Sequence, residues 1–357
     1  MLIAHENLRK FATIVFERGG SEPAEARLVA DHLVDANMVG HDSHGVGMIP
    51  TYVRHLHAGL VSPNTSADLA RDDGAILVFD GNRGYGRPAA GVAMAAAIDR
   101  CRDTGVVVAG LRRAHHIGRV GAFGEQVIAA GFVSVHFVNV TDHSPSVAPF
   151  GGADGRYVTN PVCVAVPGTE TTPPIVLDMA TTLMAQGKIR VARNKGERLP
   201  EGVVIDGQGR PSTDPEVMFQ SPQGAMMPFA TYKGYGLALV CELLAGVLSG
   251  GGTCRPQTNR NHDTILNNML SIIIDPTRLV GQDFFDSEAA ATLSHVKASP
   301  PLNPDEPVLV PGDPERATGK QRRADGIPVD EQSWRLVADA ALTAGIAEDR
   351  IEAIARV

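Results

Sequence analysis

The sequence predicts an α/β protein in which a central α/β region is flanked by helical segments at both chain ends. Between Ile76 and Leu177, short β-branched runs alternate with alanine-rich helical stretches. The first 70 or so residues and the segment after Trp334 instead place apolar residues at helical spacing. We therefore expect a helical domain built from residues 1–75 and completed by residues 300–357, and an α/β domain over residues 76–299. The chain has 357 residues, 43% of them apolar, and can bury a substantial core.

The N-terminal region begins with a predicted helix over residues 22–38. Ser21 is a candidate N-cap and Pro23 lies in the first turn. Apolar residues then recur at helical spacing at Ala26, Val29, Leu33 and Ala36. A polar, histidine-rich stretch around HDSHG follows, and residues 50–57 are predicted to be helical again.

The central region is predicted to alternate between helices and strands. Short apolar runs bounded by Gly or Pro predict strands, and longer alanine-rich stretches predict helices. The expected strands span residues 106–109, 132–139, 162–166 and 175–177, and the expected helices span residues 89–101, 122–130 and 180–193. The turn-rich segment 198–214 is expected to be a loop or a hairpin.

The C-terminal part contains the strongest helical pattern of the chain, over residues 233–248. Its apolar stripe consists of Leu237, Val240, Cys241, Leu244, Val247 and Leu248. Glycines 250–252 end this helix, and a strand is expected over residues 269–275. A proline-rich segment over residues 299–314 precedes a terminal helix over residues 334–341.

Composition and charge exclude several classes of partner. The 32 basic and 40 acidic side chains give a formal net charge of −8, and no basic block could neutralise a phosphate backbone, so no nucleic acid is expected. No apolar run reaches the roughly 20 residues that span a bilayer, and residues 1–20 lack the order of a signal peptide. The cysteines show no CxxC pairing and are expected to be reduced thiols, at Cys101, Cys163, Cys241 and Cys254. These features favour a cytoplasmic protein that does not bind membranes.

The sequence contains no dinucleotide-binding fingerprint of the Rossmann type. Gly45 and Gly47 lack the third glycine of G-x-G-x-x-G, and the glycines at positions 81, 84 and 86 have the wrong spacing. Gly118, Gly121 and Gly124 recur every third residue near a predicted helix start, where backbone N–H groups could approach a phosphate. Close packing of the helix explains the same repeat equally well.

The densest polar cluster is His41-Asp42-Ser43-His44-Gly45. A histidine has an unperturbed pKa of about 6.5, so His44 could donate and recover a proton near neutrality, with Ser43 orienting the donor. A helix cap or a hydrogen-bonded core histidine is the alternative structural interpretation. The second pair, His115 and His116, leaves another class open, a metal-dependent hydrolase or lyase that uses His41, His44 and His116. No H-E-x-x-H motif supports it, so we expect no metal; a binding protein without catalytic activity is a third possibility.

Two lysines lie within predicted helices. Lys233 heads the helix over residues 233–248, where a positive charge opposes the helix macrodipole. Lys188 follows Gly187 within the helix predicted over residues 180–193. A solvated charge explains Lys233 equally well.

Seven blocks in one order along the chain resemble the malate/L-lactate dehydrogenase family that is distinct from the Rossmann-fold enzymes of those names. The blocks are HDSHGVGMIPTY, AHHIGRVG, TNPVCVAVP, IVLDMATTLMAQGK, PSTDP, KGYGLALVCELLAGVLSG and VLVPGDPE. The strings GHDSHGVGMIP and HHIGR look most like the bacterial hydroxycarboxylate dehydrogenase B branch. The resemblance implies a non-Rossmann nicotinamide-binding α/β domain with a mixed sheet, a discontinuous helical domain from both chain ends, and a homodimer.

The resemblance also implies an activity and a set of site residues. The implied enzyme interconverts a 2-oxo acid and a 2-hydroxy acid with NAD, or with NADP. His44 matches the family's proton donor, Ser43 the neighbour that orients it, and Thr159 a position on the substrate side. The positions implied to line the cofactor are His116, Gly118, Arg119, Val120, Asp178, Met179, Ala180, Lys233, Gly234, Pro311, Gly312 and Asp313.

Two positions bear on how the substrate is held. Met48 stands where many family members carry an arginine that grips the substrate carboxylate, so Met48 is expected to form an apolar wall of the substrate pocket. Lys188 stands where the cyclic-imine reductases of the family tend to have an acidic residue. The resemblance therefore favours a hydroxy-acid enzyme in which Lys188 polarises the substrate oxygen or holds the carboxylate.

Overall fold

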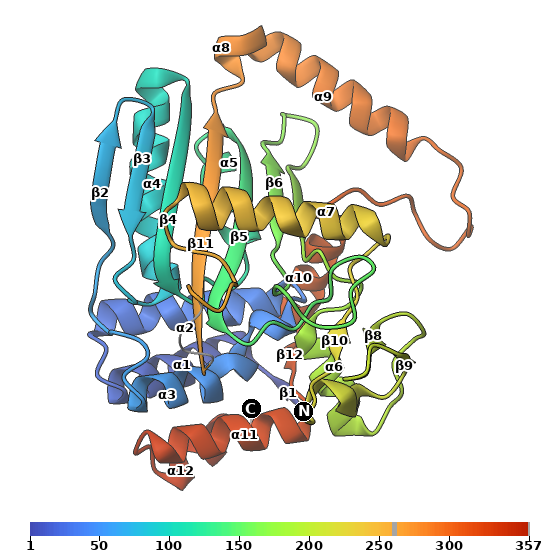
Figure 1. Ribbon diagram of the computed structural model, residues 1–357. Coiled ribbons are helices and arrows are strands. Elements are labelled where there is room, and N and C mark those ends of the chain that lie inside the picture. Colours follow the sequence, from blue (N-terminus) through green and yellow to red (C-terminus); the bar gives the residue numbers. More distant parts are fainter. Residues whose placement is uncertain (259–262, 356–357) are drawn as a thin grey trace.

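A mixed β-sheet of seven strands forms the centre of the computed structural model, which describes residues 1–258 and 263–355 (Figure 1). The strands of this sheet and of two smaller sheets are β1 (Leu2–Ile3), β2 (Asp68–Asp73), β3 (Ile76–Asp80), β4 (Val106–His115), β5 (Val133–His143), β6 (Val162–Val166), β7 (Ile175–Met179), β8 (Val204–Ile205), β9 (Pro211–Ser212), β10 (Ala225–Met226), β11 (Asp263–Ile274) and β12 (Ile327–Pro328). The order across the large sheet is β2-β3-β4-β11-β5-β6-β7. Of its described pairings, only β3–β4 is parallel. The predicted α/β class with a mixed sheet is confirmed, and the antiparallel neighbours distinguish it from a doubly wound Rossmann sheet.

Helices lie on both faces of the sheet and at its lower end in Figure 1. They are α1 (His5–Arg18), α2 (Pro23–Met38), the short η1 (Asp42–His44) and η2 (Val46–Met48), α3 (Ile49–His57), α4 (Gly86–Thr104), α5 (Gly121–Ile128), α6 (Gln186–Lys195), η3 (Pro215–Met218), α7 (Tyr232–Cys241), η4 (Glu242–Leu248), α8 (Thr277–Val280), α9 (Gln282–Lys297), α10 (Asp313–Asp325), α11 (Glu331–Thr343) and α12 (Glu348–Ala355). Within the described residues, no helix is both long and apolar enough to cross a membrane.

One face of the sheet packs against α4 and α5. Alternate strand residues Val107, Ala109 and Leu111 are buried there, because side chains alternate between the two faces of a strand. The facing side of α4 presents the small side chains of Ala89, Ala93 and Ala97, which let the helix approach the sheet closely. The opposite face contacts η4, and α7 crosses in front of the sheet (Figure 1).

Most predicted elements are confirmed. The helices predicted over residues 22–38, 50–57, 89–101, 122–130 and 334–341 and the strands predicted over residues 106–109, 132–139, 162–166, 175–177 and 269–275 all coincide with observed elements. The segment 198–214 contains the paired strands β8 and β9, so it is a hairpin. All four cysteine thiols are buried. Strands β2 and β3 and helices α9 and α10 were not anticipated.

The helix predicted over residues 180–193 begins only at Gln186, so this prediction was wrong for its first turns. Hydrogen bonds with other segments hold the preceding residues in a non-helical conformation. The N–H of Thr181 donates to the carbonyl of Thr159 at 3.0 Å, and the N–H of Leu183 donates to the carbonyl of Met227 at 3.0 Å. Backbone groups engaged in this way cannot enter a helix.

The helix predicted over residues 233–248 changes character at Glu242, where the π-helix η4 begins. The Glu242 carboxylate is buried and accepts hydrogen bonds from Asn160 Nδ2 at 2.9 Å and from the N–H of Cys254 at 3.0 Å. Part of the apolar stripe noted in the sequence is exposed, at Val240, Val247 and Leu248. The molecule therefore carries an uncovered apolar helix face.

The two chain ends share one apolar core. Strand β1 pairs with β12, and the aromatic rings of Phe11 and Trp334 lie 5.5 Å apart. Strand β2 lies within residues 1–75 yet pairs with β3 at the edge of the large sheet. The division into a helical domain and an α/β domain stays a prediction. Helix α9 projects from the body, and the largely exposed segment 299–309 leads back to α10 (Figure 1).

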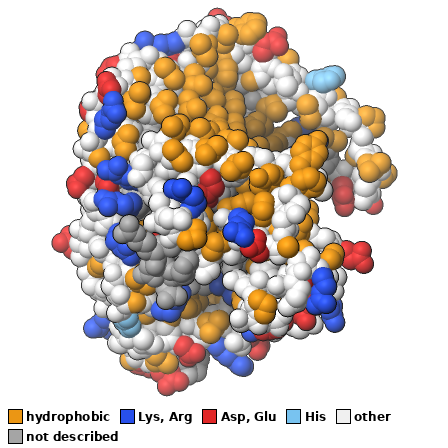
Figure 2. All heavy atoms as spheres, in the orientation of Figure 1, with side chains coloured by type: hydrophobic (Ala, Val, Ile, Leu, Met, Phe, Trp, Pro, Cys, Tyr) orange, Lys and Arg blue, Asp and Glu red, His pale blue; other side chains and the backbone are white. Residues whose placement is uncertain are grey.

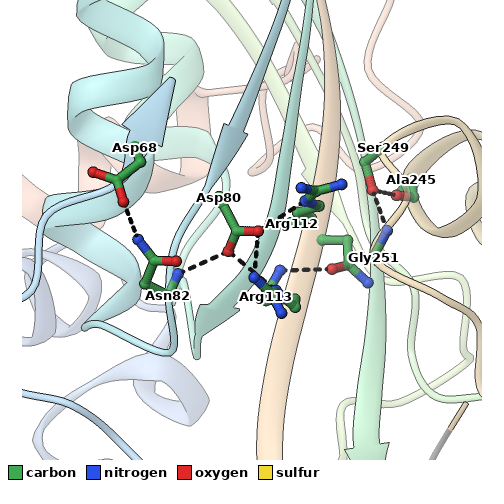
Figure 3. A network of polar contacts seen from close by, with 9 residues as sticks. Asp68, Asp80, Asn82, Arg112, Arg113, Ala245, Ser249 and Gly251 are labelled. Atoms are coloured by element: carbon green, nitrogen blue, oxygen red, sulfur yellow. Dashed lines mark hydrogen bonds and ion pairs between the residues drawn. The ribbon is translucent and has the colours of Figure 1, made fainter. Parts of the chain in front are cut away.

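The buried carboxylate of Asp80 joins three neighbouring strands (Figure 3). It accepts hydrogen bonds from Arg112 Nε at 2.9 Å and from Arg113 Nε at 3.1 Å. The N–H of Arg113 in turn donates to Asn268 Oδ1 on β11 at 2.8 Å. Burial acts to raise the pKa of Asp80, but the hydrogen bonds from Arg113, the Asn82 N–H and Arg112 outweigh it and hold the pKa below its ordinary value.

We expect Asp80→Ala to lower the free energy of unfolding by roughly 1–3 kcal/mol, because two partly exposed arginines lose a charged acceptor. Chemical denaturation at pH 7 and one protein concentration measures this. The lowered pKa adds stability that is present above the ordinary carboxyl pKa and is lost as the pH falls through the lowered pKa. Asp72→Ala is the matched control, because it removes an exposed carboxylate paired with Arg100. An equal loss in both variants would contradict the role assigned to Asp80.

Candidate active site

His44 and His116 contact each other directly, although 72 residues separate them in the chain. His44 Nδ1 lies 3.2 Å from His116 Nε2, and the two rings stack with an interplanar angle of 14°. His44 ends η1, and His116 follows the last residue of β4. The contact therefore joins the helical end of the molecule to the sheet.

The loop that carries His44 is fixed by Asn37 at the end of α2. Asn37 Nδ2 donates to Asp42 Oδ1 at 2.6 Å, and Asn37 Oδ1 accepts from the N–H of Val46 at 2.8 Å. A side chain at Gly45 would collide with Asn37, since a Cβ there would lie 2.2 Å from Asn37 Oδ1. Arg322 of α10 donates to Asp42 Oδ2 at 2.9 Å, so the C-terminal segment supports the same loop.

Tyr52 extends the histidine pair to a chain of three hydrogen-bonded side chains. Its hydroxyl is 2.8 Å from His116 Nδ1 and donates to the His116 carbonyl at 3.2 Å. One arrangement of protons that satisfies both contacts has an N–H at His116 Nδ1 donating to the hydroxyl and an N–H at His44 Nδ1 donating to His116 Nε2. His44 Nε2 has no partner among the described residues. This arrangement leaves one nitrogen of the pair free to accept a proton.

The electrostatic environment keeps both rings neutral at pH 7. Burial lowers the pKa of His44 to about 4, while the negative charge of Asp178 acts in the opposite direction. Burial and the neighbouring His44 hold the pKa of His116 well below its ordinary value. A neutral His44 at pH 7 can act as a proton acceptor, and Asp178 stabilises the charged form that results.

A cavity of about 490 Å³ gathers three of the predicted cofactor residues, Arg119, Asp178 and Gly312. Helix α10 contributes three further cations to its wall, Arg316, Lys320 and Arg323. Arg119 is 3% exposed and pairs with Glu125, but its buried Nε has no partner among the described residues. Such a donor beside several cations is suited to an anionic ligand. Asp178 Oδ2 accepts from the N–H of Gly121 at the start of α5, at 2.7 Å.

The glycine repeat at positions 118, 121 and 124 serves close packing. A Cβ at Gly118, whose φ is +72°, would lie 2.2 Å from His32 Nε2. A Cβ at Gly121 would lie 2.5 Å from Arg119 Nη1, and one at Gly124 would lie 2.8 Å from the Cβ of Ala165. A phosphate contact at Gly118 stays a prediction.

The remaining predicted cofactor positions differ in accessibility. Val120 is buried at the start of α5, and Met179 and Ala180 are half-buried at the end of β7. Gly234 is buried in the first turn of α7, whereas Lys233 beside it is exposed. Their contacts with a cofactor stay predictions.

Pro311 and Asp313 bring the C-terminal segment to the edge of the sheet. The Pro311 carbonyl accepts from the N–H of Val176 on β7 at 3.4 Å. Burial acts to raise the pKa of Asp313, but hydrogen bonds from Lys297 and Arg316 lower it to about 2. This carboxylate is therefore charged at pH 7 and already paired.

The predicted catalytic and substrate residues lie in different environments. Ser43 is half-buried and packs against Gly187 of α6, where a Cβ would come within 2.6 Å of the Ser43 Cβ. Lys188 is exposed, and Met48 is buried in the core shared by the chain ends. The Thr159 carbonyl accepts from Thr181 Oγ1 at 2.8 Å. Roles for Lys188, Met48 and Thr159 in substrate binding stay predictions.

The histidine set of the metal-dependent alternative is not brought together. His41 Nε2 lies 3.2 Å from Glu315 Oε1 on α10, whereas His44 and His116 contact each other. Among residues 1–258 and 263–355, no group of three or more His, Cys, Asp or Glu side chains is placed to hold a metal ion.

Sequence reasoning missed Tyr52 and the cations of α10. Tyr52 lies within the HDSHGVGMIPTY block, eight residues after His44. Its place in that block was the only feature of the sequence that connected it with the site. The cations of α10 follow the VLVPGDPE block at helical spacing, at Arg316, Lys320 and Arg323. A helix prediction for this segment would have placed them on one face.

Comparison with known proteins identifies close relatives. The family model described as malate/L-lactate dehydrogenase matches residues 3–338. Hydroxycarboxylate dehydrogenase B of Escherichia coli (strain K12) is 46% identical over 349 residues, covering 98% of this chain and 96% of that protein. The L-lactate dehydrogenase of Cupriavidus necator is 41% identical over 307 residues, covering 86% of this chain and 87% of that protein. The solved sulfolactate dehydrogenase of Methanocaldococcus jannaschii superimposes with a TM-score of 0.83 at 31% identity and covers 99% of each chain.

We expect the imidazole of His44 to show no titration midpoint between pH 8 and pH 5.5, because burial lowers its pKa to about 4. Imidazole NMR signals, assigned with His44→Gln, measure this. Asp178→Asn should lower the pKa further, because it removes the negative charge that favours protonated His44 and keeps an oxygen for the Gly121 N–H. Asp72→Asn, a change in an exposed carboxylate, should leave it unchanged. A midpoint near 6.5 would contradict the buried environment assigned to His44.

Proposed function

The chain belongs to the malate/L-lactate dehydrogenase family, and we propose that it is an NAD(P)-dependent enzyme that interconverts a 2-hydroxy acid and the corresponding 2-oxo acid. The observation that carries this proposal is the free Nε2 of His44, which is held by His116 and Tyr52 and feels the charge of Asp178 in the wall of the cation-lined cavity. The relatives support the substrate class, since they are named hydroxycarboxylate, L-lactate and sulfolactate dehydrogenases.

The cavity residues fit a nicotinamide dinucleotide. Arg119 offers a buried N–H without a partner among the described residues, and Arg316, Lys320 and Arg323 add positive charge suited to phosphate groups. When bound, the cofactor would supply or accept the hydride. NAD is the proposed cofactor, and NADP is the alternative.

His44 performs the proton chemistry in this proposal. In the oxidation direction, its neutral Nε2 accepts the hydroxyl proton of the substrate. The hydrogen bonds to His116 and Tyr52 do not change, because the N–H at His44 Nδ1 is the donor in both protonation states. Asp178 stabilises the imidazolium, and in the reduction direction the same Nε2–H returns the proton to the carbonyl oxygen.

We also propose a homodimer, formed through the sheet face opposite α4 and α5. On that face the half-buried residues are apolar where a solvated sheet would be polar, at Val108, Val135, Phe137, Val164 and Ile272. The adjacent α7 and η4 expose Leu239, Val240, Leu243, Val247 and Leu248. Figure 2 shows hydrophobic side chains gathered over this part of the sheet and around α7. An exposed apolar surface of this kind is typical of a protein interface.

Helix α9 supports the proposed homodimer, and the cysteines support the proposed cytoplasmic location. None of the 16 residues of α9 is buried in the single chain, and Phe284 is 58% exposed. A second copy of the chain would cover such a helix. The cysteines are buried thiols, which fits the proposed cytoplasmic location.

We expect the purified protein to reduce at least one 2-oxo acid from a panel of pyruvate, phenylpyruvate, oxaloacetate and sulfopyruvate. Nicotinamide absorbance with NADH and with NADPH measures the rates. His44→Ala should lower kcat by about 10²–10⁴, the usual contribution of a positioned acid or base, with little change in the Kd for NADH.

The control for His44→Ala is His57→Ala, which changes an exposed histidine at the end of α3 and should keep wild-type kcat. Treatment with EDTA should leave the activity unchanged. Activity that disappears with EDTA and returns with zinc would favour the metal-dependent hydrolase or lyase. Retention of kcat in His44→Ala would exclude His44 as the proton carrier.

We expect light scattering after size-exclusion chromatography to give twice the chain mass of 37.7 kDa. The double variant Leu243→Asp, Val247→Asp should give the mass of one chain, because charges on η4 oppose burial of this face. Leu336→Asp, on the exposed side of α11, should stay dimeric. A monomeric wild type at micromolar concentration would overturn the dimer.

A further inference from the structure

Arg190 of α6 faces the loop that carries His44. Gly187 and Arg190 are three residues apart and therefore lie on the same side of the helix. At Gly187 that side contacts Ser43, as described above. At Arg190 it approaches η2, since Nη2 lies 3.9 Å from the position that a Cβ on Gly47 would occupy. No other atom from outside the immediate chain lies within 4 Å of that position, so the space above Gly47 is open and bordered by the Arg190 guanidinium.

The Arg190 guanidinium has no ion pair or hydrogen bond within residues 1–258 and 263–355. Burial lowers its pKa, and the charge of Asp330 only partly compensates. The Asp330 carboxylate is itself engaged, because it caps α11 by accepting from the N–H of Ser333 at 2.9 Å. One turn further along α6, Arg193 instead forms two hydrogen bonds with Glu216, at 2.7 and 2.9 Å. A partly buried cation without a partner is costly, and an anionic ligand would relieve that cost.

Other cations near the site are paired, exposed or part of the wall of the cavity proposed for the cofactor. Arg54 Nη2 lies 3.3 Å from His55 Nε2, and the side chain lines a groove against α11. Arg119 pairs with Glu125. Lys188 is exposed, and on a helix it points about 100° away from its neighbour Gly187.

We propose that Arg190 binds the carboxylate of the 2-hydroxy or 2-oxo acid in the open space above Gly47. The inference rests on the proposed function and deepens it by naming the residue that recognises the acid. A 2-hydroxy acid carries its carboxylate and its hydroxyl on neighbouring carbons, so the groups that bind them must flank one small space. Arg190 approaches Gly47, which lies three residues after His44 in the same loop. The planar guanidinium can donate two parallel hydrogen bonds to a carboxylate, so it can bind the substrate carboxylate, which the uncharged side chain of Met48 cannot do.

The test compares Arg190→Met, Arg190→Lys, Lys188→Met and the control Arg193→Met in the full-length protein. With the best 2-oxo acid of the wild type, kcat/KM should fall about 10²-fold or more in Arg190→Met, mainly through KM. The kcat/KM of Arg190→Lys should lie between those of Arg190→Met and the wild type. Arg193→Met removes a guanidinium already paired with Glu216, so kcat/KM of this variant should stay within about threefold of wild type. The Kd for NADH and the inhibition constant of oxamate are measured in each variant. NADH binding should be unchanged, whereas oxamate should bind more weakly only without the guanidinium.

A second readout is specific to the carboxylate. The ratio of kcat/KM for pyruvate to that for pyruvamide should collapse in Arg190→Met, because the amide lacks the negative charge. If the wild type reduces 2-oxo acids and Arg190→Met keeps both its kcat/KM and this ratio, the assignment is overturned while the proposed function stands. A loss confined to Lys188→Met would move the anchor to Lys188. If the wild type reduces no 2-oxo acid, the proposed function is wrong and the assignment falls with it.

Discussion

The contact between His44 and His116 is the constraint on which the site depends. It requires that η1 at the end of the helical region and the end of β4 in the sheet meet within hydrogen-bonding distance. Asn37 and Gly45 shape the first segment, and the pairing of β4 with β3 and β11 fixes the second. Tyr52 contacts the other ring nitrogen of His116 and so adds a second restraint on that ring. A small movement of the helical region against the sheet would break the pair, so the packing between them is a functional requirement.

The α/β class could be predicted from the sequence because it depends on local periodicity. The alternation of β-branched runs with alanine-rich stretches is visible over windows of a few residues, and the elements found at Val162–Val166 and Pro23–Met38 match it closely. Boundaries set by distant segments could not be predicted in this way. Gln186 starts α6 because residues before it pair with Thr159 and Met227, and no local pattern encodes those partners. The π-helix at Glu242 likewise follows from a buried carboxylate that must reach Asn160.

The candidate site was predictable only in part, for the same reason. Sequence motifs singled out His44, Ser43 and His116, because acid–base chemistry restricts the residue types that can serve. They did not single out Arg190, because one arginine among four basic residues of a helix carries no signal until the loop opposite is known. The apolar stripe over residues 233–248 was recognised in the sequence. Such a stripe indicates a surface that binds another chain as readily as a face that packs in the core of its own chain.

The walls of the cation-lined cavity come from parts of the chain that are far apart in sequence. Arg119 and Asp178 belong to the sheet region, whereas Arg316 and Lys320 belong to α10, which is reached through the exposed segment 299–309. A ligand that touches both walls binds only when α10 is docked, and by mass action it lowers the population in which the C-terminal segment detaches. Ligand occupancy would therefore slow proteolysis of α10, which requires its detachment, whereas the exposed 299–309 segment would stay accessible to proteases.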